Sequence, residues 1–140
     1  MKILVPVDGS ESANRAIDHV IRLANDQPGI DIHVLNVQMP IISGHVKMFI
    51  SETQLNDYYR DEAHVVLKPV EERLNQANVP FSHHINVGHV AETIAQYAKE
   101  KGIDQIVMGT RGMGAISDFV LGSVATKVIH LSAVPVTLIK

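Results

Sequence analysis

The sequence contains no cysteine and no tryptophan, and aromatic side chains make up only 4% of its 140 residues. The lack of cysteine excludes a disulfide framework, an iron–sulfur cluster and thiol catalysis. The scarcity of aromatic rings leaves no stacking surface for nucleic-acid bases. The net charge of −3, without a basic run, also argues against non-specific binding of DNA or RNA.

Long hydrophobic runs are missing too. No segment approaches the roughly 18 apolar residues of a membrane-spanning helix, and the chain opens on a strand-like segment instead of a secretory signal. We therefore expect a cytoplasmic protein that contacts neither a membrane nor nucleic acid. With 46% hydrophobic and 19% charged residues, the chain has enough apolar material for a single domain over residues 1–140 with an aliphatic core.

Short apolar segments alternate with helical stripes along the chain. Strands are predicted over 2–7, 30–37, 81–87, 106–108 and 135–139, and helices over 13–24, 52–77, 91–98 and 124–131. Ser10 or Ser12 is expected to cap the first helix, Pro69 to kink or split the second near Leu67, and Gly102 to end the third. Residues 38–50 are predicted to form a long, apolar loop that covers a pocket or meets a partner.

This alternation predicts an α/β fold with a parallel sheet and right-handed crossovers. Ligands of such open sheets bind at the carboxyl ends of the strands, where the strand order reverses. The turn at Asp8, after the first strand, and the glycine loop after the fourth are the expected walls of that crevice.

The glycine loop is the most informative stretch. Gly109, Gly112 and Gly114 follow the fourth strand, and Gly122 with Ser123 precedes the last helix. Glycines let backbone N–H groups approach an anion, and a helix N-terminus adds unpaired donors, so the arrangement favours a phosphate. The spacing matches neither the P-loop nor the dinucleotide fingerprint. Arg111 and Lys127 are the nearby cations.

Each of these features also has a purely structural interpretation. Asp8 could be a turn residue, the glycines could be turn formers, and Arg111 could be a solvated loop residue. The eight histidines do not predict a zinc site, because His83 and His84 point to opposite faces of a strand and no cysteine assists. No nucleophile elbow is present, and no carboxylate is placed to activate water beside a phosphate.

Motifs in three separated stretches of the chain resemble the universal stress protein family, in its UspA-like, ATP-binding branch. The spacing Gly109-x-x-Gly112-x9-Gly122-Ser123 is similar to the family's nucleotide-binding pattern. ILVPVDGSE, from residue 3, and VGHVAE, from residue 87, are similar to its first and third strand-turns, and VATKVIHLSAVPVTLIK is similar to its last helix and strand. The resemblance implies a Rossmann-like sheet of order 3-2-1-4-5 with helices on both faces.

The resemblance also implies which residues bind an adenine nucleotide. Pro6, Val7 and Val37 would line the base pocket, Asp8 would bind the ribose or adenine side, and Met108 and Gly109 would flank the ribose. The phosphates would be held by Arg111, Gly112, Gly122, Ser123 and Val124. Ala125 stands where ATP-binding relatives often carry a second hydroxyl. Mg²⁺ or Mn²⁺ would accompany the phosphates, and the last strand, Val134 to Ile139, would pair two copies into a homodimer.

Three functions are open at this point. The first is an ATP-binding stress-response sensor or regulator, with hydrolysis slow or absent and an unknown protein partner. The second is an ATPase or nucleotidyl-transferring enzyme on the same scaffold. The third is a dimeric interaction protein that binds no nucleotide and uses residues 38–50 and the dimer as its surfaces.

Overall fold

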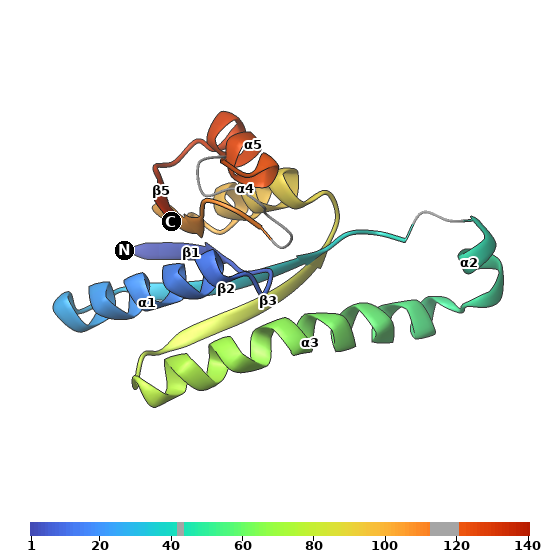
Figure 1. Cartoon of the computed structure of the whole chain (residues 1–140), viewed down its shortest axis with the longest axis horizontal. Helices are drawn as coiled ribbons and strands as arrows, with labels where there is room; N and C mark the ends of the chain where they lie inside the picture. The colour runs from blue at the N-terminus through green and yellow to red at the C-terminus, as the bar shows by residue number, and fades with distance from the viewer. Residues whose placement is uncertain (42–43, 113–120) are drawn as a thin grey trace.

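The computed structural model describes residues 1–41, 44–112 and 121–140. In chain order, its elements are β1 (Lys2–Pro6), α1 (Glu11–Asp26), β2 (Asp31–Gln38), α2 (Gly44–Phe49), α3 (Glu52–Gln76), β3 (Phe81–Val87), α4 (Val90–Glu100), β4 (Gln105–Gly109), α5 (Ser123–Leu131) and β5 (Val136–Ile139). The five strands form one parallel sheet of order β3-β2-β1-β4-β5, which confirms the predicted fold class. Figure 1 shows this arrangement.

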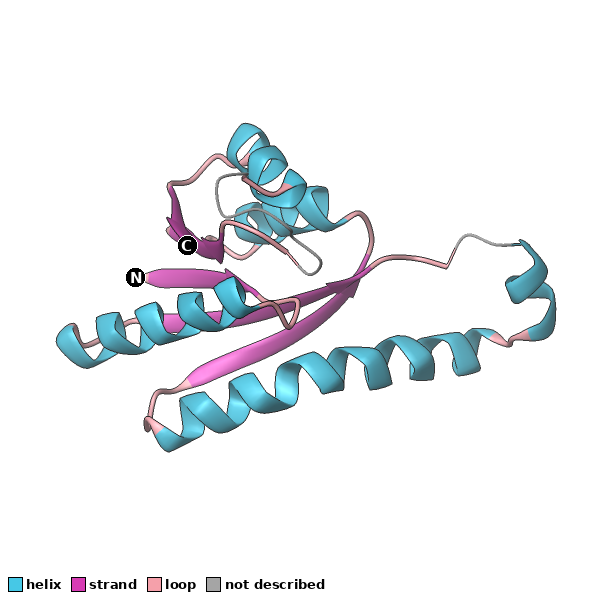
Figure 2. Cartoon of the chain, in the orientation of Figure 1, coloured by secondary structure: helices cyan, strands magenta, loops and turns pink. Residues whose placement is uncertain are grey.

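The core lies in two layers, one on each face of the sheet. Side chains alternate along β1, so that Ile3 and Val5 pack under α1 and α3, whereas Leu4 packs under α4 and α5. Figure 2 shows the two pairs of helices on opposite sides of the strands. Because β1 lies between β2 and β4, the strand order reverses at β1, and the carboxyl ends of β1 and β4 open a gap between the two helical layers.

Helix α3 decides one of the alternatives for Pro69. It runs unbroken from Glu52 to Gln76 with Pro69 inside it, so of the predicted kink or split near Leu67, the split is wrong. Pro69 leaves the carbonyl of Val65 without its helical donor, but Val65 is 74% exposed, and water can satisfy that carbonyl. The buried stripe of α3 runs through Tyr59, Ala63, Leu67, Val70 and Leu74.

The segment 38–50 is not a loop throughout, because residues Gly44–Phe49 form the short helix α2. Figure 1 shows α2 and the first turns of α3 beyond the end of the sheet. Met48 and Phe49 are 78% and 81% exposed. None of the described residues of 38–50 lines the crevice at the carboxyl ends of β1 and β4.

The helix ends follow their predicted signals with small shifts. Ser10 caps α1, since its hydroxyl accepts the N–H of Ala13. Gly102 adopts a φ of +64° directly after the cap residue Lys101, the left-handed position that favours glycine. In α5 the N-cap is Gly122 and Ser123 is the first helical residue, so Ser123 does not cap this helix. Within the described parts of the chain, no helix is long and apolar enough to cross a membrane.

Candidate functional site

A pocket of about 400 Å³ opens at the carboxyl ends of β1 and β4. All eleven residues predicted as site residues line it: Pro6, Val7, Asp8, Val37, Met108, Gly109, Arg111, Gly112, Gly122, Ser123 and Val124. Six further residues complete the described lining: Ser10, Ala13, Leu35, Val90, Ile94 and Ala125. The sequence prediction therefore places its residues around one cavity, although they come from four separate segments.

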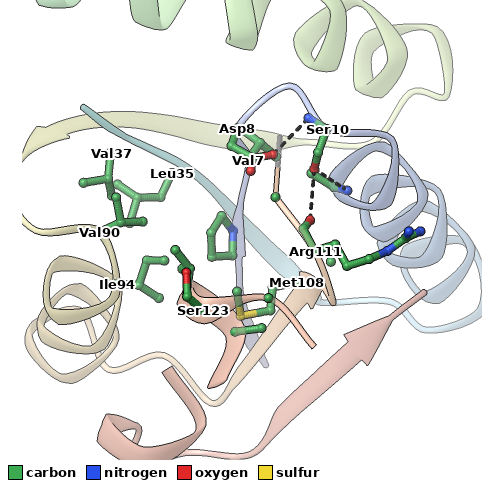
Figure 3. A pocket seen from close by; sticks show the side chains of 17 residues that line it. Val7, Asp8, Ser10, Leu35, Val37, Val90, Ile94, Met108, Arg111 and Ser123 are labelled. Carbon is green, nitrogen blue, oxygen red and sulfur yellow. Dashed lines mark hydrogen bonds between the residues drawn. The ribbon is translucent and has the colours of Figure 1, made fainter. Parts of the chain in front are cut away.

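One side of the pocket is apolar. Leu35 and Val37 reach it from β2, and Val90 and Ile94 reach it from α4, as Figure 3 shows. Leu35 and Val37 share one face of a strand because they are two residues apart. Val90 and Ile94 share one face of a helix because they are four apart. These spacings are the signal by which Leu35, Val90 and Ile94 could have been found from the sequence.

The start of α5 forms a polar part of the same pocket. Its N-cap, Gly122, has no side chain to bond the first turn. The first backbone bond of the helix runs from the N–H of Thr126 to the carbonyl of Gly122. The N–H groups of Ser123, Val124 and Ala125 therefore lack helical partners and a side-chain cap, and they carry the partial positive charge of a helix N-terminus.

Glycine is required at this site because neighbouring atoms lie too close for a Cβ, not because the turn needs a positive φ. None of Gly109, Gly112 and Gly122 has a positive φ. A Cβ on Gly122 would lie 3.1 Å from the carbonyl oxygen of Thr110 and 3.2 Å from the Cα of Arg111, and a Cβ on Gly109 would lie 2.8 Å from the carbonyl carbon of Ser12. The third loop glycine, Gly114, lies outside the described residues.

Asp8 closes the turn after β1. Its Oδ1 accepts the backbone N–H of Ser10 at 2.9 Å, which is the turn role that the structural interpretation gave it. Its Oδ2 faces Gly112, where a Cβ would approach it to 3.0 Å. Asp8 is therefore a turn residue and a pocket-lining carboxylate at once.

Arg111 lines the pocket mainly with its backbone. Its carbonyl accepts the hydroxyl of Ser12 at 2.6 Å and that of Ser10 at 3.5 Å. In Figure 3 its side chain points away from the pocket, along α1. Ser12 was missed by sequence reasoning as a contact of the glycine loop, because nothing in its own neighbourhood indicates a partner about a hundred residues away.

Lys127 does not face the pocket. Its Nζ lies 2.7 Å from Oε1 of Glu92, so the pair links α5 to α4. The hydrogen bond from Lys127 holds the pKa of the Glu92 carboxyl below its usual range. Among the described residues, no three His, Asp or Glu side chains converge as metal ligands.

A cluster of two histidines and a tyrosine lies on the same face of the sheet as the apolar side of the pocket. The hydroxyl oxygen of Tyr97, on α4, lies 2.8 Å from Nδ1 of His33, and the rings of His33 and His84 stack with centroids 5.7 Å apart. Burial, with a smaller contribution from Asp31, raises the pKa of Tyr97 to about 12. His83 points to the other face and pairs with Glu71, as strand alternation predicts.

Comparison with known proteins identifies the family and relatives of this chain. The model of the universal stress protein family matches residues 1–140. Universal stress protein YxiE of Bacillus subtilis is 30% identical over 99% of this chain and 98% of its own length.

Two solved structures have the same fold, and one of them was solved with a bound ligand. The structure of MJ0577 from Methanocaldococcus jannaschii superposes with a TM-score of 0.82 at 29% identity, covering 99% of this chain and 94% of that one. A universal stress protein family protein from Arabidopsis thaliana, solved with AMP bound, superposes with a TM-score of 0.72 at 21% identity, covering 100% of this chain and 91% of that one.

Proposed function

This chain belongs to the universal stress protein family, and from that premise we propose that it binds an adenine nucleotide in the pocket between β1 and β4. In this proposal the protein is a cytoplasmic homodimer that acts as a nucleotide-dependent regulator of a stress response. ATP is its proposed ligand, and hydrolysis is slow or absent.

One observation carries the proposal: a single cavity of about 400 Å³ joins an apolar side to an uncapped helix N-terminus. An adenine base suits the apolar side chains of β2 and α4, since ligand pockets combine such walls with a few placed polar groups. Phosphates suit the free N–H groups at the start of α5. The related protein that was solved with AMP supports the same class of ligand.

Different pocket residues would contact the base, the ribose and the phosphates of this nucleotide. Val37, Pro6 and Val7 would flank the base, and Asp8 would accept a ribose hydroxyl through Oδ2. Ser123 and the N–H groups of α5 would hold the phosphates, with Mg²⁺ or Mn²⁺ bound by the phosphates themselves. Arg111 would contribute chiefly its backbone, given the direction of its side chain in Figure 3.

The regulator is preferred over the ATPase because of Asp8. It is the one carboxylate among the described residues that line the pocket; its Oδ1 accepts the N–H of Ser10, and its Oδ2 would accept the ribose hydroxyl in this proposal. A general base that activates water needs a free, well-placed acceptor. Release of phosphate over many turnovers, measured with ATP and Mg²⁺, would favour the enzyme instead.

The proposed dimer uses the open edge of β5. The carbonyls of Pro135 and Ile139 accept bonds from the β4 side, so alternation turns the N–H groups of Val136 and Leu138 outward. An unpaired edge invites a second copy. Val136→Pro removes an outward donor and should convert dimer to monomer in sedimentation velocity. An unchanged dimer in this variant would contradict the proposed interface.

Calorimetric titration of ATP and of AMP, each with Mg²⁺, into nucleotide-free protein tests the proposal. Val37→Trp fills the apolar side, whereas Val87→Trp places the same side chain at a 46% exposed position on the neighbouring strand β3. We expect micromolar binding by the wild type and by Val87→Trp, and affinity at least about tenfold weaker in Val37→Trp. No heat and no rise in melting temperature at millimolar ATP would defeat the proposal.

A further inference from the structure

Asn36 is a polar side chain buried in the core beside the pocket, but not in it. Only 3% of its surface is exposed. It lies on β2 between Leu35 and Val37, which line the pocket. Alternation turns it to the opposite face, where Ile32 and Val34 of the same strand pack under α1 and α3. A buried amide is unfavourable unless its hydrogen bonds are made, so its partners indicate its role.

Both ends of this amide are engaged. Nδ2 of Asn36 donates to the carbonyl of Val7 at 2.9 Å, and Oδ1 accepts from Nε2 of Gln38 at 2.7 Å. Strand β1 ends at Pro6, whose register partner is Leu35. The carbonyl of Val7 thus lies just past the strand and is held by a side chain.

The bond to Asn36 fixes the direction of the peptide between Val7 and Asp8. No cis peptide bond occurs in the described chain, and in a trans peptide the carbonyl and the N–H point to opposite sides. Since the Val7 carbonyl points toward β2, the N–H of Asp8 points toward β4. That is the side on which Gly109, Arg111 and Gly112 form the other wall of the pocket.

We propose that Asn36 is a positioning residue for nucleotide binding. It acts through the Val7 carbonyl to hold the Asp8 turn in its ligand-binding orientation, and Gln38 fixes which end of the Asn36 amide faces Val7. This inference rests on the proposed nucleotide site. The competing interpretation is a core amide that contributes only to stability.

Three variants separate positioning from stability. Asn36→Leu keeps the volume and removes the donor, and Gln38→Met removes the bond that orients the amide. Val34→Ala, two residues away on the same face, creates a cavity in the same core layer but removes no hydrogen bond to the Val7 carbonyl. Affinity for AMP is measured by calorimetry, and stability by urea denaturation, on each protein. We expect the Kd to rise about tenfold in Asn36→Leu, to rise less in Gln38→Met, and to stay at the wild-type value in Val34→Ala despite its lost stability.

An unchanged Kd in Asn36→Leu, or an equal rise in Val34→Ala, overturns the inference. Where Asn36→Leu does not fold, Gln38→Met decides, because its side chain is only partly buried; an unchanged Kd there also overturns the inference. Wild-type protein that binds no AMP or ATP defeats the proposed function itself, and the inference with it. Weakened binding in the Asn36 and Gln38 variants, with wild-type binding in Val34→Ala, supports both the proposed function and the inference.

Discussion

The close contact between the end of β4 and the start of α1 makes Gly109→Ala a demanding test of the fold. A Cβ at residue 109 would collide with the hydroxyl of Ser12 and would lie 2.8 Å from both its carbonyl carbon and its Cβ. A side-chain rotation can remove the first clash. The carbonyl carbon belongs to the backbone of α1, so the helix itself must move.

The magnitude follows from these contacts. Forcing one extra carbon into a packed interior costs about 1–3 kcal/mol. Ser12 is buried and its hydroxyl bonds the carbonyl of Arg111 at 2.6 Å, so rotating it away loses a further hydrogen bond of about 1 kcal/mol. We expect Gly109→Ala to lower the free energy of unfolding by about 2–4 kcal/mol.

Urea denaturation followed by circular dichroism measures this change. Gly44→Ala is the matched control, since among the described residues no atom beyond its own neighbours and helix lies within 4 Å of a Cβ there, and it should change stability by less than about 0.5 kcal/mol. Adding Ser12→Gly to Gly109→Ala removes two of the three clashing atoms and should restore part of the loss. A Gly109→Ala protein as stable as Gly44→Ala would refute the reasoning.

Three further substitutions are predicted from single features. Asn78 has a φ of +56° at the end of α3, so Asn78→Ala should lower the free energy of unfolding by about 1 kcal/mol, whereas Asn78→Gly should not; equal urea midpoints would contradict this. Burial, and then the charge of His33, lower the pKa of His84. The unfolded chain therefore binds this proton more readily, and stability falls as pH drops below about 6.5. His84→Gln should lessen that fall in thermal melts, and an unchanged pH slope would count against it. Ala125→Ser adds a hydroxyl inside the pocket and should tighten ATP binding about tenfold in calorimetry; unaltered or weaker affinity would contradict a phosphate at this position.

Periodicity and turn chemistry were enough to predict the strands, a parallel sheet and a crevice at its carboxyl edge, whereas the strand order and the eleven site residues were implied by the resemblance to the universal stress protein family. Parallel strands bring their carboxyl ends to one edge, so turns such as Asp8 and Gly112 meet even though they are distant in sequence. Alternation of side chains likewise separates His83 from His84. These features depend on local geometry that repeats along an element, and a sequence displays such repetition directly.

What the sequence could not indicate depends on single long-range contacts. The direction of the Arg111 side chain and the bond from Ser12 to its carbonyl are set by how α1 packs against β4. The role of Asn36 depends on where β1 stops beside β2. Helix α2 could not be predicted because Pro40 and Gly44 interrupt an apolar segment too short to show helical periodicity.

The first turns of α3 extend beyond the end of the sheet, so this end of the helix should unfold locally more easily than the rest of the fold. At about 1.5 Å per residue, the 25 residues of α3 extend about 37 Å, whereas the seven residues of β3 extend about 23 Å. The residues from Glu52 to Tyr58 bury no side chain against the sheet. Their amides should exchange with deuterium through local fraying, while those around Leu67 wait for global unfolding. The chain can therefore absorb insertions at this end of α3 without disturbing the strands or the crevice.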